Sequence, residues 1–414
     1  MSRARSSALP GPRRHFDLVV FGATGFTGAL VAEHLHATAG VGGELSWALA
    51  GRDLAKLAAV RERIGAPPEL PLIRADAGDA AGLSALVAQA RCVLTTVGPY
   101  QRYGTALVEA CADAGTDYVD LCGEVGWMAR MIPKLQPAAR RSGAHIVFSC
   151  GFDSIPFDLG VVHLQSVAQQ RFGAPMPRVR SLVRVMKGTL SGGTMASALA
   201  TLEAMRNDPD EAARLADPFA LTPGFRGPAQ PDPGGAVHDD LAGTWSGPFM
   251  MAEINTRNVH RTHFLLGHPW GKDFVYDERM ATGDGADGER RARRLVQLDR
   301  WQRRLLDFGP SRAVLQRLVL PRPGQGPSAR QRERGRFEVL LVGSNPEGQT
   351  VRTVVKGERD PGYGATSRIV AETARCLLAQ GDRAEGGVYT PGALLGLTLV
   401  ERLQARAGMR FDTE

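Results

Sequence analysis

The sequence lacks the cysteine patterns that mark disulfide-stapled and metal-binding chains. Its five cysteines, at positions 92, 111, 122, 150 and 376, form no CxxC pair and no spacing typical of metal ligands. An odd and scattered set is typical of reduced thiols in a cytosolic protein. We therefore expect no disulfide framework, no metal and a cytoplasmic location.

Long apolar runs are also missing. No uncharged apolar stretch reaches the roughly eighteen residues that a membrane-spanning helix needs. Residues 1–14 contain four arginines and two prolines but no apolar run of secretory type, which predicts a disordered basic leader rather than a signal peptide. A peripheral contact at the inner face of the plasma membrane stays open.

What is present is enough apolar material for a folded core. Of the 414 residues 43% are hydrophobic, which excludes wholesale disorder and is typical of two to three domains. From residue 16 to about residue 157, short apolar runs alternate with helical patterns, as in βαβ units. The runs are continuous, which is typical of parallel strands buried on both faces. They lie at residues 18–21, 45–50, 70–75, 92–97, 118–121 and 146–149.

The pattern changes after residue 158. Residues 336–342 and 350–356 alternate apolar with polar and predict an antiparallel hairpin with one wet face. Residues 207–247 are rich in Pro, Gly and Asp and predict a long loop or lid. The predicted fold is α/β: a Rossmann-type doubly wound parallel sheet in residues 15–158, followed by an α+β substrate domain with a mainly antiparallel sheet in residues 159–385. Residues 386–414 should form a helical segment returning to the first domain.

A glycine turn follows the first predicted strand and precedes a helix. In this context Gly22 permits a sharp turn, Gly25 lets backbone N–H groups approach a pyrophosphate, and Gly28 lets the helix lie close to the sheet. A tight turn that binds nothing is the alternative. We expect the whole turn to contact a dinucleotide: Gly22, Ala23, Thr24, Gly25, Phe26, Thr27 and Gly28.

The end of the second predicted strand indicates which dinucleotide. NAD-binding sheets place an acid there for the ribose hydroxyls, and NADP-binding sheets an arginine for the 2′-phosphate. Arg52 comes first and Lys56 follows one helical turn later, which favours NADPH. Arg52 as a solvated loop cation and Asp53 as the N-cap of the next helix are the alternatives.

Two further positions belong to the expected cofactor site. Asp76, after the third strand, would flank the adenine, unless it is a cap or a loop residue. Gly98 and Pro99, after the fourth strand, suit a close backbone contact with the nicotinamide half.

The ordered series of motifs resembles the saccharopine dehydrogenase-like oxidoreductases, and within them most closely the actinobacterial trans-acting enoyl reductases. The motifs are GATGFTG, GRD, VGPYQRYG, YVDLCGE and GFDSIPFDLG, followed by runs at residues 188–194, 362–366 and 387–391. The resemblance implies a Rossmann domain, a second α+β domain and a reductase that supplies the enoyl reduction missing from a polyketide synthase, in cell-envelope lipid and glycolipid assembly. It implies a lipid or acyl-thioester substrate and an acidic acyl carrier domain as a partner.

Enoyl reduction needs a donor for the enolate oxygen and a proton for the α-carbon, from residues at the carboxyl ends of strands four to six. The candidates are Tyr100, Glu124, Asp153 and Ser154. Each has an alternative: Tyr100 could pack over the cofactor, Glu124 could bind a backbone N–H, and Asp153 with Ser154 could cap the helix near Pro156. A turn with Lys187, Ser191 and Thr194 could bind a thioester oxygen or merely permit packing.

A basic region spans residues 290–336. Leu295, Leu298, Trp301 and Leu305 recur at helical spacing among arginines. Such a helix could bind an acidic carrier protein or an anionic membrane surface, or could pack on its own core with a solvated cationic face. No nucleic-acid-binding motif accompanies the charge.

Three functions follow from these observations. The first is an NADPH-dependent enoyl reductase acting on a lipid or polyketide acyl intermediate. The second is a saccharopine-type dehydrogenase acting on an amino-acid imine, and the third is a non-catalytic NADP-sensing protein at a membrane surface.

Overall fold

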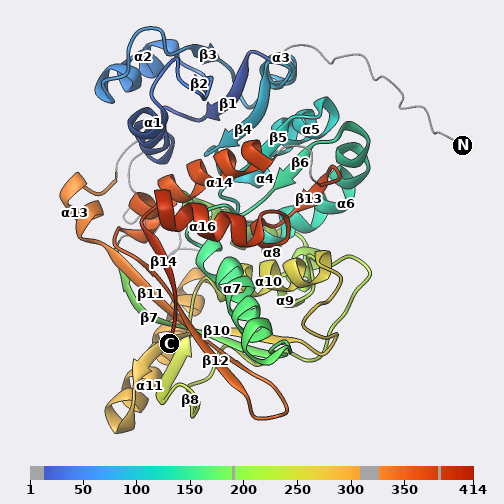
Figure 1. The fold of residues 1–414 in the computed structure, drawn as a ribbon, viewed down its shortest axis with the longest axis vertical. Helices are drawn as coiled ribbons and strands as arrows, with labels where there is room; N and C mark the ends of the chain where they lie inside the picture. Colours follow the sequence, from blue (N-terminus) through green and yellow to red (C-terminus); the bar gives the residue numbers. More distant parts are fainter. Residues whose placement is uncertain (1–13, 189–191, 308–325, 381–383) are drawn as a thin grey trace, which may run out of the picture.

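The computed structural model describes residues 14–188, 192–307, 326–380 and 384–414, which contain two seven-stranded sheets (Figure 1). The first sheet is parallel throughout and has the order β13-β6-β5-β4-β1-β2-β3. This confirms the predicted doubly wound sheet, with β13 as a strand that the sequence did not predict. Its strands are β1 (Phe16–Phe21), β2 (Trp47–Gly51), β3 (Leu72–Arg74), β4 (Ala90–Thr95), β5 (Asp117–Val119), β6 (His145–Val147) and β13 (Gly387–Tyr389).

Helices cover both faces of this sheet because its strands are apolar on both faces. Leu18 and Val20 of β1 belong to one core cluster with α1 and α2, and Val19 and Phe21 to another with α3, α5 and α6. The helices are α1 (Phe26–Ala39), α2 (Leu54–Arg63), α3 (Ala80–Val87), α4 (Tyr100–Tyr103), α5 (Thr105–Ala114) and α6 (Val125–Ser142).

The second sheet has the order β14-β12-β11-β7-β10-β9-β8. Only β7 and β10 pair in parallel, which confirms the prediction of a mainly antiparallel sheet in the described residues. Its strands are β7 (Arg178–Lys187), β8 (Val237–Asp239), β9 (Thr244–Pro248), β10 (Val275–Gly283), β11 (Arg336–Ser344), β12 (Thr350–Gly357) and β14 (Met409–Thr413). The remaining helices are α7 (Ile155–Phe172), α8 (Gly192–Asn207), α9 (Pro209–Ala216), α10 (Ala252–Leu265), α11 (Gly285–Asp307), α13 (Ala329–Arg334), the π-helical turn η1 (Pro361–Ala365), α14 (Thr366–Gln380), α15 (Pro391–Leu394) and α16 (Gly396–Arg406).

Two local predictions for the second domain were wrong. Residues 207–247 are not one long loop, because Asp208 caps α9 and Pro209 stands in its first turn, where proline and aspartate favour a helix. The same stretch also contains β8 and the start of β9. The predicted wet face of the hairpin is buried at Leu340 and Val342, which pack with Leu182 and Val354.

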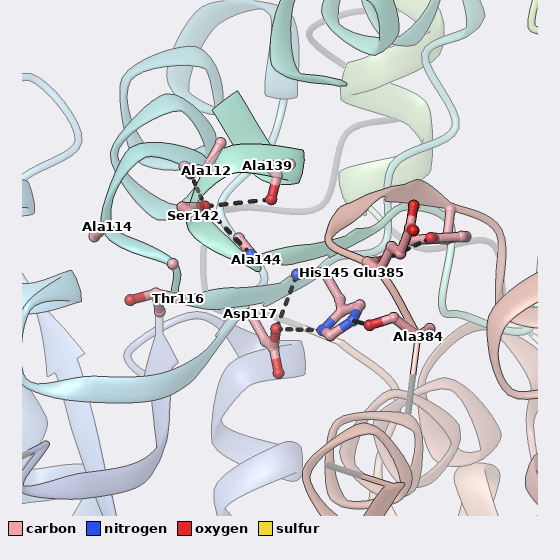
Figure 2. A network of polar contacts seen from close by, with 12 residues as sticks. Ala112, Ala114, Thr116, Asp117, Ala139, Ser142, Ala144, His145, Ala384 and Glu385 are labelled. Atoms are coloured by element: carbon pink, nitrogen blue, oxygen red, sulfur yellow. Dashed lines mark hydrogen bonds and ion pairs between the residues drawn. The ribbon is translucent and has the colours of Figure 1, made fainter. Parts of the chain in front are cut away.

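The C-terminal segment and Arg14 contact the two sheets. Residues 386–414 contain two strands besides helices: β13 lies beside β6 in the first sheet, and β14 lies beside β12 in the second. Figure 2 shows His145 at the amino end of β6, where its ring contacts an Asp117 carboxylate oxygen at 3.0 Å and the Ala384 carbonyl at 3.1 Å. Arg14, which the sequence placed in the disordered leader, donates hydrogen bonds to the Ala90 and Ala114 carbonyls. The rest of that leader lies outside the described residues.

Three helices join the two sheets into one body (Figure 1). Helix α14 packs on the first sheet beside α1, α7 packs on β11 and β12, and α16 contacts both α14 and α7. The buried Glu372 carboxylate of α14 accepts hydrogen bonds from His34 of α1 at 2.9 Å, Arg375 at 2.8 Å and Arg402 of α16 at 2.7 Å. Helix α1 is therefore fixed to the C-terminal helices by charged hydrogen bonds inside the core.

Two features are absent from the described ranges. These ranges contain no helix that is both long enough and apolar enough to cross a bilayer. They also contain no group of three or more His, Cys, Asp or Glu side chains placed to hold a metal ion.

Candidate active site at the carboxyl edge of the parallel sheet

The glycine turn has the geometry that only glycine allows. Gly22 has a φ of +88°, and a Cβ there would stand 2.6 Å from the Val97 side chain. A Cβ on Gly28 would stand 2.3 Å from the Gly22 carbonyl oxygen, so α1 begins in direct contact with the turn. Gly25 is the N-cap of α1 and has no side chain to bond the first N–H groups of the helix. These N–H groups and the helix dipole form an anion site at the mouth of the turn.

The turn lies where the order of the strands reverses. In the order β3-β2-β1-β4-β5-β6 the switch falls between β1 and β4, the place where open α/β sheets bind ligands. The Thr96 hydroxyl donates to the Gly22 carbonyl at 3.3 Å, so the end of β4 and the glycine turn border the same crevice. Gly98 and Pro99 follow directly, and a Cβ on Gly98 would stand 3.9 Å from the Ser197 hydroxyl of α8.

At the end of β2, Arg52 is exposed. Asp53 is the N-cap of α2 and accepts hydrogen bonds from the Ala55 and Lys56 N–H groups at 2.9 and 3.1 Å, which confirms its capping role. The exposed Lys56 ammonium stands 3.9 Å from Asp53. At the end of β2 the structure therefore presents two cations to solvent. The Asp53 carboxylate between them is hydrogen-bonded to the first N–H groups of α2.

Asp76 is exposed after β3 and accepts a hydrogen bond from the Gly78 N–H at 2.9 Å. This is the geometry of an Asx turn, so the loop alternative accounts for the residue. A contact with adenine stays a prediction.

Glu124 holds α4 in place. Its carboxylate accepts hydrogen bonds from the Tyr100 N–H at 2.7 Å and the Gln101 N–H at 2.8 Å, which are the first N–H groups of α4. The Ser197 hydroxyl of α8 donates to the same carboxylate at 2.7 Å. Two of these three donors are backbone N–H groups, so the contacts favour the alternative that Glu124 binds backbone N–H groups, and its catalytic role stays a prediction.

Tyr100 is buried under Trp127, with ring centroids 5.9 Å apart. Its hydroxyl accepts from the Leu121 N–H at 3.1 Å and donates to the Thr95 carbonyl at 3.4 Å. Burial, with the charge of Asp120 next in size, raises the pKa of Tyr100 well above its usual range. The hydroxyl therefore stays protonated and bonded to the backbone, and a role as proton donor stays a prediction.

Asp153 and Ser154 lie after β6, at the start of α7, and the side chain of Ser154, the N-cap residue, does not cap that helix. The Ser154 hydroxyl instead donates to the Asn255 amide oxygen at 3.1 Å and accepts from the Asn258 amide at 3.1 Å. The capping alternative is wrong for Ser154, because two amides of α10 occupy its hydroxyl.

Asp153 is half-buried, and the Thr194 hydroxyl of α8 stands 3.4 Å from its carboxylate. Burial raises the pKa of Asp153 to about 6, although the hydrogen bond from Thr194 acts in the opposite direction. Of the four predicted catalytic side chains in this edge, Asp153 has the fewest competing partners. Ser191, grouped with Thr194 on the sequence, lies outside the described residues.

Sequence reasoning missed several residues of this edge. Asn255 and Asn258 stand one helical turn apart on α10, and this spacing of two amides was the available signal. Ser197 of α8 carried no signal. Asp120, at the end of β5, accepts hydrogen bonds from the Cys122 and Ser149 N–H groups at 3.0 and 2.9 Å. Burial raises the pKa of Asp120 to about 7 in spite of these bonds.

Comparison with known proteins adds to this geometry. Residues 18–147 match the family described as the saccharopine dehydrogenase NADP binding domain. A Mycobacterium tuberculosis protein, named provisionally as a trans-acting enoyl reductase, is 40% identical over 97% of this chain and 98% of its own length. The trans-acting enoyl reductase of Mycobacterium bovis is 36% identical over 97% of this chain and 98% of its own. The solved apo saccharopine dehydrogenase (L-Glu forming) of Saccharomyces cerevisiae has a TM-score of 0.54 at 11% identity, over 96% of this chain and 99% of its own, a likeness of fold alone.

Proposed function

We propose that this chain reduces a carbon–carbon double bond of a lipid or polyketide acyl intermediate. It belongs to the saccharopine dehydrogenase-like family that includes the trans-acting enoyl reductases, and it is therefore an NADP-dependent oxidoreductase. The observation that carries this proposal is the 36–40% identity, over nearly the whole chain, to proteins named as trans-acting enoyl reductases. The pathway we propose is lipid or glycolipid biosynthesis, with the acyl group presented as a thioester.

The residues at the switch point fit NADPH. A Cβ at Gly22 would clash with the Val97 side chain and a Cβ at Gly28 with the backbone of the turn, so these glycines keep the turn tight against β4 and the N-terminus of α1. Arg52 and Lys56 are exposed where the adenosine 2′-phosphate is bound in NADP-binding sheets. We propose that the turn holds the pyrophosphate, that these two cations hold the 2′-phosphate and that Gly98 borders the nicotinamide.

Bound NADPH would supply the hydride for the β-carbon, and the chain has to supply the rest. We propose Asp153 as the proton source for the α-carbon. Its raised pKa of about 6 leaves part of the population protonated near neutrality, and Thr194 is placed to orient its carboxyl group. Ser154, held by Asn255 and Asn258, fixes the backbone at the start of α7 from which Asp153 projects.

Helix α8 supplies the cover of the site. It contacts the first domain through the Ser197–Glu124 hydrogen bond and approaches the end of β6 through Thr194. A cover in this position reduces the access of water to the reacting carbons and strengthens the electrostatic contacts there. The substrate thioester would lie between α8 and the carboxyl ends of β4 to β6.

The experiment that tests this function is NADPH oxidation with 2-enoyl thioesters of increasing chain length. We expect turnover with enoyl thioesters and none with an aldehyde and glutamate, which together present an imine. The reverse result would support a saccharopine-type dehydrogenase, whose fold the chain shares. Tight NADPH binding without turnover on either substrate would contradict both.

For a partner, we propose that α11 contacts an anionic membrane surface. Of its predicted apolar stripe, Leu295 faces the protein, but Leu298 and Trp301 are 51% and 62% exposed. Arg294, Leu298 and Trp301 stand at i, i+4 and i+7, so they share the outward face of a helix that projects from the second sheet (Figure 1). An exposed tryptophan and leucine among arginines is typical of interfacial helices.

Flotation of the protein on liposomes tests this contact. We expect binding to vesicles with anionic lipids, little binding to neutral vesicles, and loss of binding in Trp301→Ala with Leu298→Ser. Gln302→Ala, a change on the same exposed helix, is the matched control. Binding to an isolated acidic carrier domain, without flotation, would replace the membrane by the carrier as the partner.

A further inference from the structure

A cationic cavity lies on the flank of α1, apart from the carboxyl edge of the sheet. Its volume is about 240 Å³. One wall is α1, from Leu30 to Thr38, and the other is built by α13, the segment before η1, and the ends of α14 and α16. The cavity therefore separates the nucleotide-binding helix from the second domain, and it shares no lining residue with the glycine turn.

Four arginines from four places in the chain line this cavity: Arg332, Arg359, Arg368 and Arg406. Arg332 donates to the Pro327 carbonyl at 2.8 Å. The side chains of the other three form no hydrogen bond or ion pair with the residues that the structure describes. Three guanidinium groups thus converge on one space without a bonded acid.

The acids nearby do not neutralise them. Glu33 and Glu333 also line the cavity, but both are exposed and neither comes within ion-pair distance of an arginine in the described residues. Burial and then the neighbouring charge of Arg359 lower the pKa of Arg368, while Glu33 acts in the opposite direction. The arginines therefore repel one another in the free protein, and a bound anion would relieve that repulsion.

We propose that this cavity is a binding site for a phosphate monoester, separate from the NADPH site. Guanidinium groups present planar pairs of N–H donors that match phosphate oxygens, and they are weakly hydrated enough to bind them in a partly buried place. The volume greatly exceeds the roughly 15 Å³ that one water requires, so a phosphate and a few attached atoms fit. The cavity is too small to enclose a whole dinucleotide, so it takes the phosphate monoester of a ligand whose remaining atoms lie outside it.

The site is placed to communicate with the cofactor turn. The Arg332 guanidinium lies 5.6 Å from the centre of the Phe26 ring, and Phe26 is the first residue of α1. The same ring packs edge-on against Tyr363 of η1, with centroids 4.8 Å apart. An anion held by these arginines would therefore contact the wall that positions the N-terminus of α1.

The test is thermal unfolding of NADPH-saturated protein, so that the glycine turn and Arg52 are already occupied. We expect inorganic phosphate to raise Tm by a few degrees above sodium chloride at equal ionic strength. The double variant Arg359→Ala with Arg368→Ala should lose this rise, and Arg406→Ala should reduce it. Arg330→Ala and Arg334→Ala, which remove exposed arginines of α13 outside the cavity, should keep it.

Two further measurements make the result decisive. Each variant must bind NADPH with the wild-type Kd. If the double variant does not fold, Arg406→Ala, which removes an exposed arginine, takes its place in the experiment. The phosphate monoester could belong to the thiol carrier of the substrate or to a free phosphorylated ligand. Coenzyme A and dephospho-coenzyme A, which differ by one phosphate monoester, distinguish these two sources. A larger rise in Tm with coenzyme A indicates the carrier, and equal rises indicate a free phosphorylated ligand. No rise with phosphate beyond the chloride control, or an equal rise in all variants, would overturn the proposal.

Discussion

We propose that Arg52 selects NADPH over NADH, and its removal is the sharpest test of the cofactor site. It is exposed at the carboxyl end of β2, and Asp53 beside it is occupied in capping α2. A charge-assisted hydrogen bond contributes about 1.5–3 kcal/mol. Because Arg52 is exposed, solvent and salt screen the contact and the lower half of that range applies. Since about 1.4 kcal/mol corresponds to a tenfold change, Arg52→Ala should raise the Kd for NADPH about tenfold to fortyfold.

The Kd for NADH should stay within about twofold of wild type, because NADH has no 2′-phosphate for the arginine to contact. NADPH and NADH fluorescence titrations at two salt concentrations measure both values, and the NADPH effect should shrink at high salt. Arg63→Ala is the matched control: it removes the same charge at the other end of α2, about 14 Å away, which exceeds a Debye length of about 8 Å. Equal losses for both dinucleotides, or the same loss in Arg63→Ala, would refute the assignment.

Three further predictions concern the turn, the core and the proton source. Gly28→Ala should lower stability by about 1–3 kcal/mol and weaken NADPH binding, because its Cβ would meet the backbone of the turn at 2.3 Å. Urea unfolding measures the stability and cofactor titration the affinity. Gly123→Ala, which has open space around its Cβ, is the control and should change neither quantity. Burial alone would raise the pKa of Glu372, but His34 and two arginines outweigh it and lower the pKa below 4.5. The ionised carboxylate therefore adds to the free energy of unfolding above pH about 4.5, and this contribution is lost as the pH falls. Glu372→Gln should lower the free energy of unfolding by about 3–5 kcal/mol at pH 7 and weaken its decrease towards acid pH. If protonated Asp153 donates the α-proton, kcat should fall as pH rises through about 6. Asp153→Asn should lower kcat about a hundredfold and remove this pH dependence, with little change in KM. An unchanged pH profile in the variant would exclude Asp153 as the proton donor.

The parallel sheet and the cofactor turn could be predicted because their signals are local. A buried strand, three glycines and a helix follow one another within residues 16–39, and Arg52 follows the next strand. The predicted loop over residues 207–247 failed for a local reason as well: Asp208 and Pro209 start a helix as readily as they break one. The basic helix α11 was predicted, but not which of its apolar residues would remain exposed, because that depends on the sheet it packs against.

The contacts around the predicted catalytic residues show most clearly what the sequence could not predict. Thr194 meets Asp153 over 41 residues of sequence, Ser197 meets Glu124 over 73, and Asn255 meets Ser154 over 101. No periodicity or spacing relates such pairs, since each contact depends on how α8 and α10 pack against the first sheet.

The sequence by itself determined the parallel sheet, the glycine turn and the cation at the end of β2, because each follows from residues a few positions apart whose backbone and charge requirements are local. Only the tertiary structure decided which of the predicted acids are held by several hydrogen bonds and which has a raised pKa. Glu124 accepts three hydrogen bonds from α4 and α8, whereas burial raises the pKa of Asp153. The physical reason is that hydrogen-bond saturation and desolvation are set by neighbours distant in sequence, and packing alone brings these together.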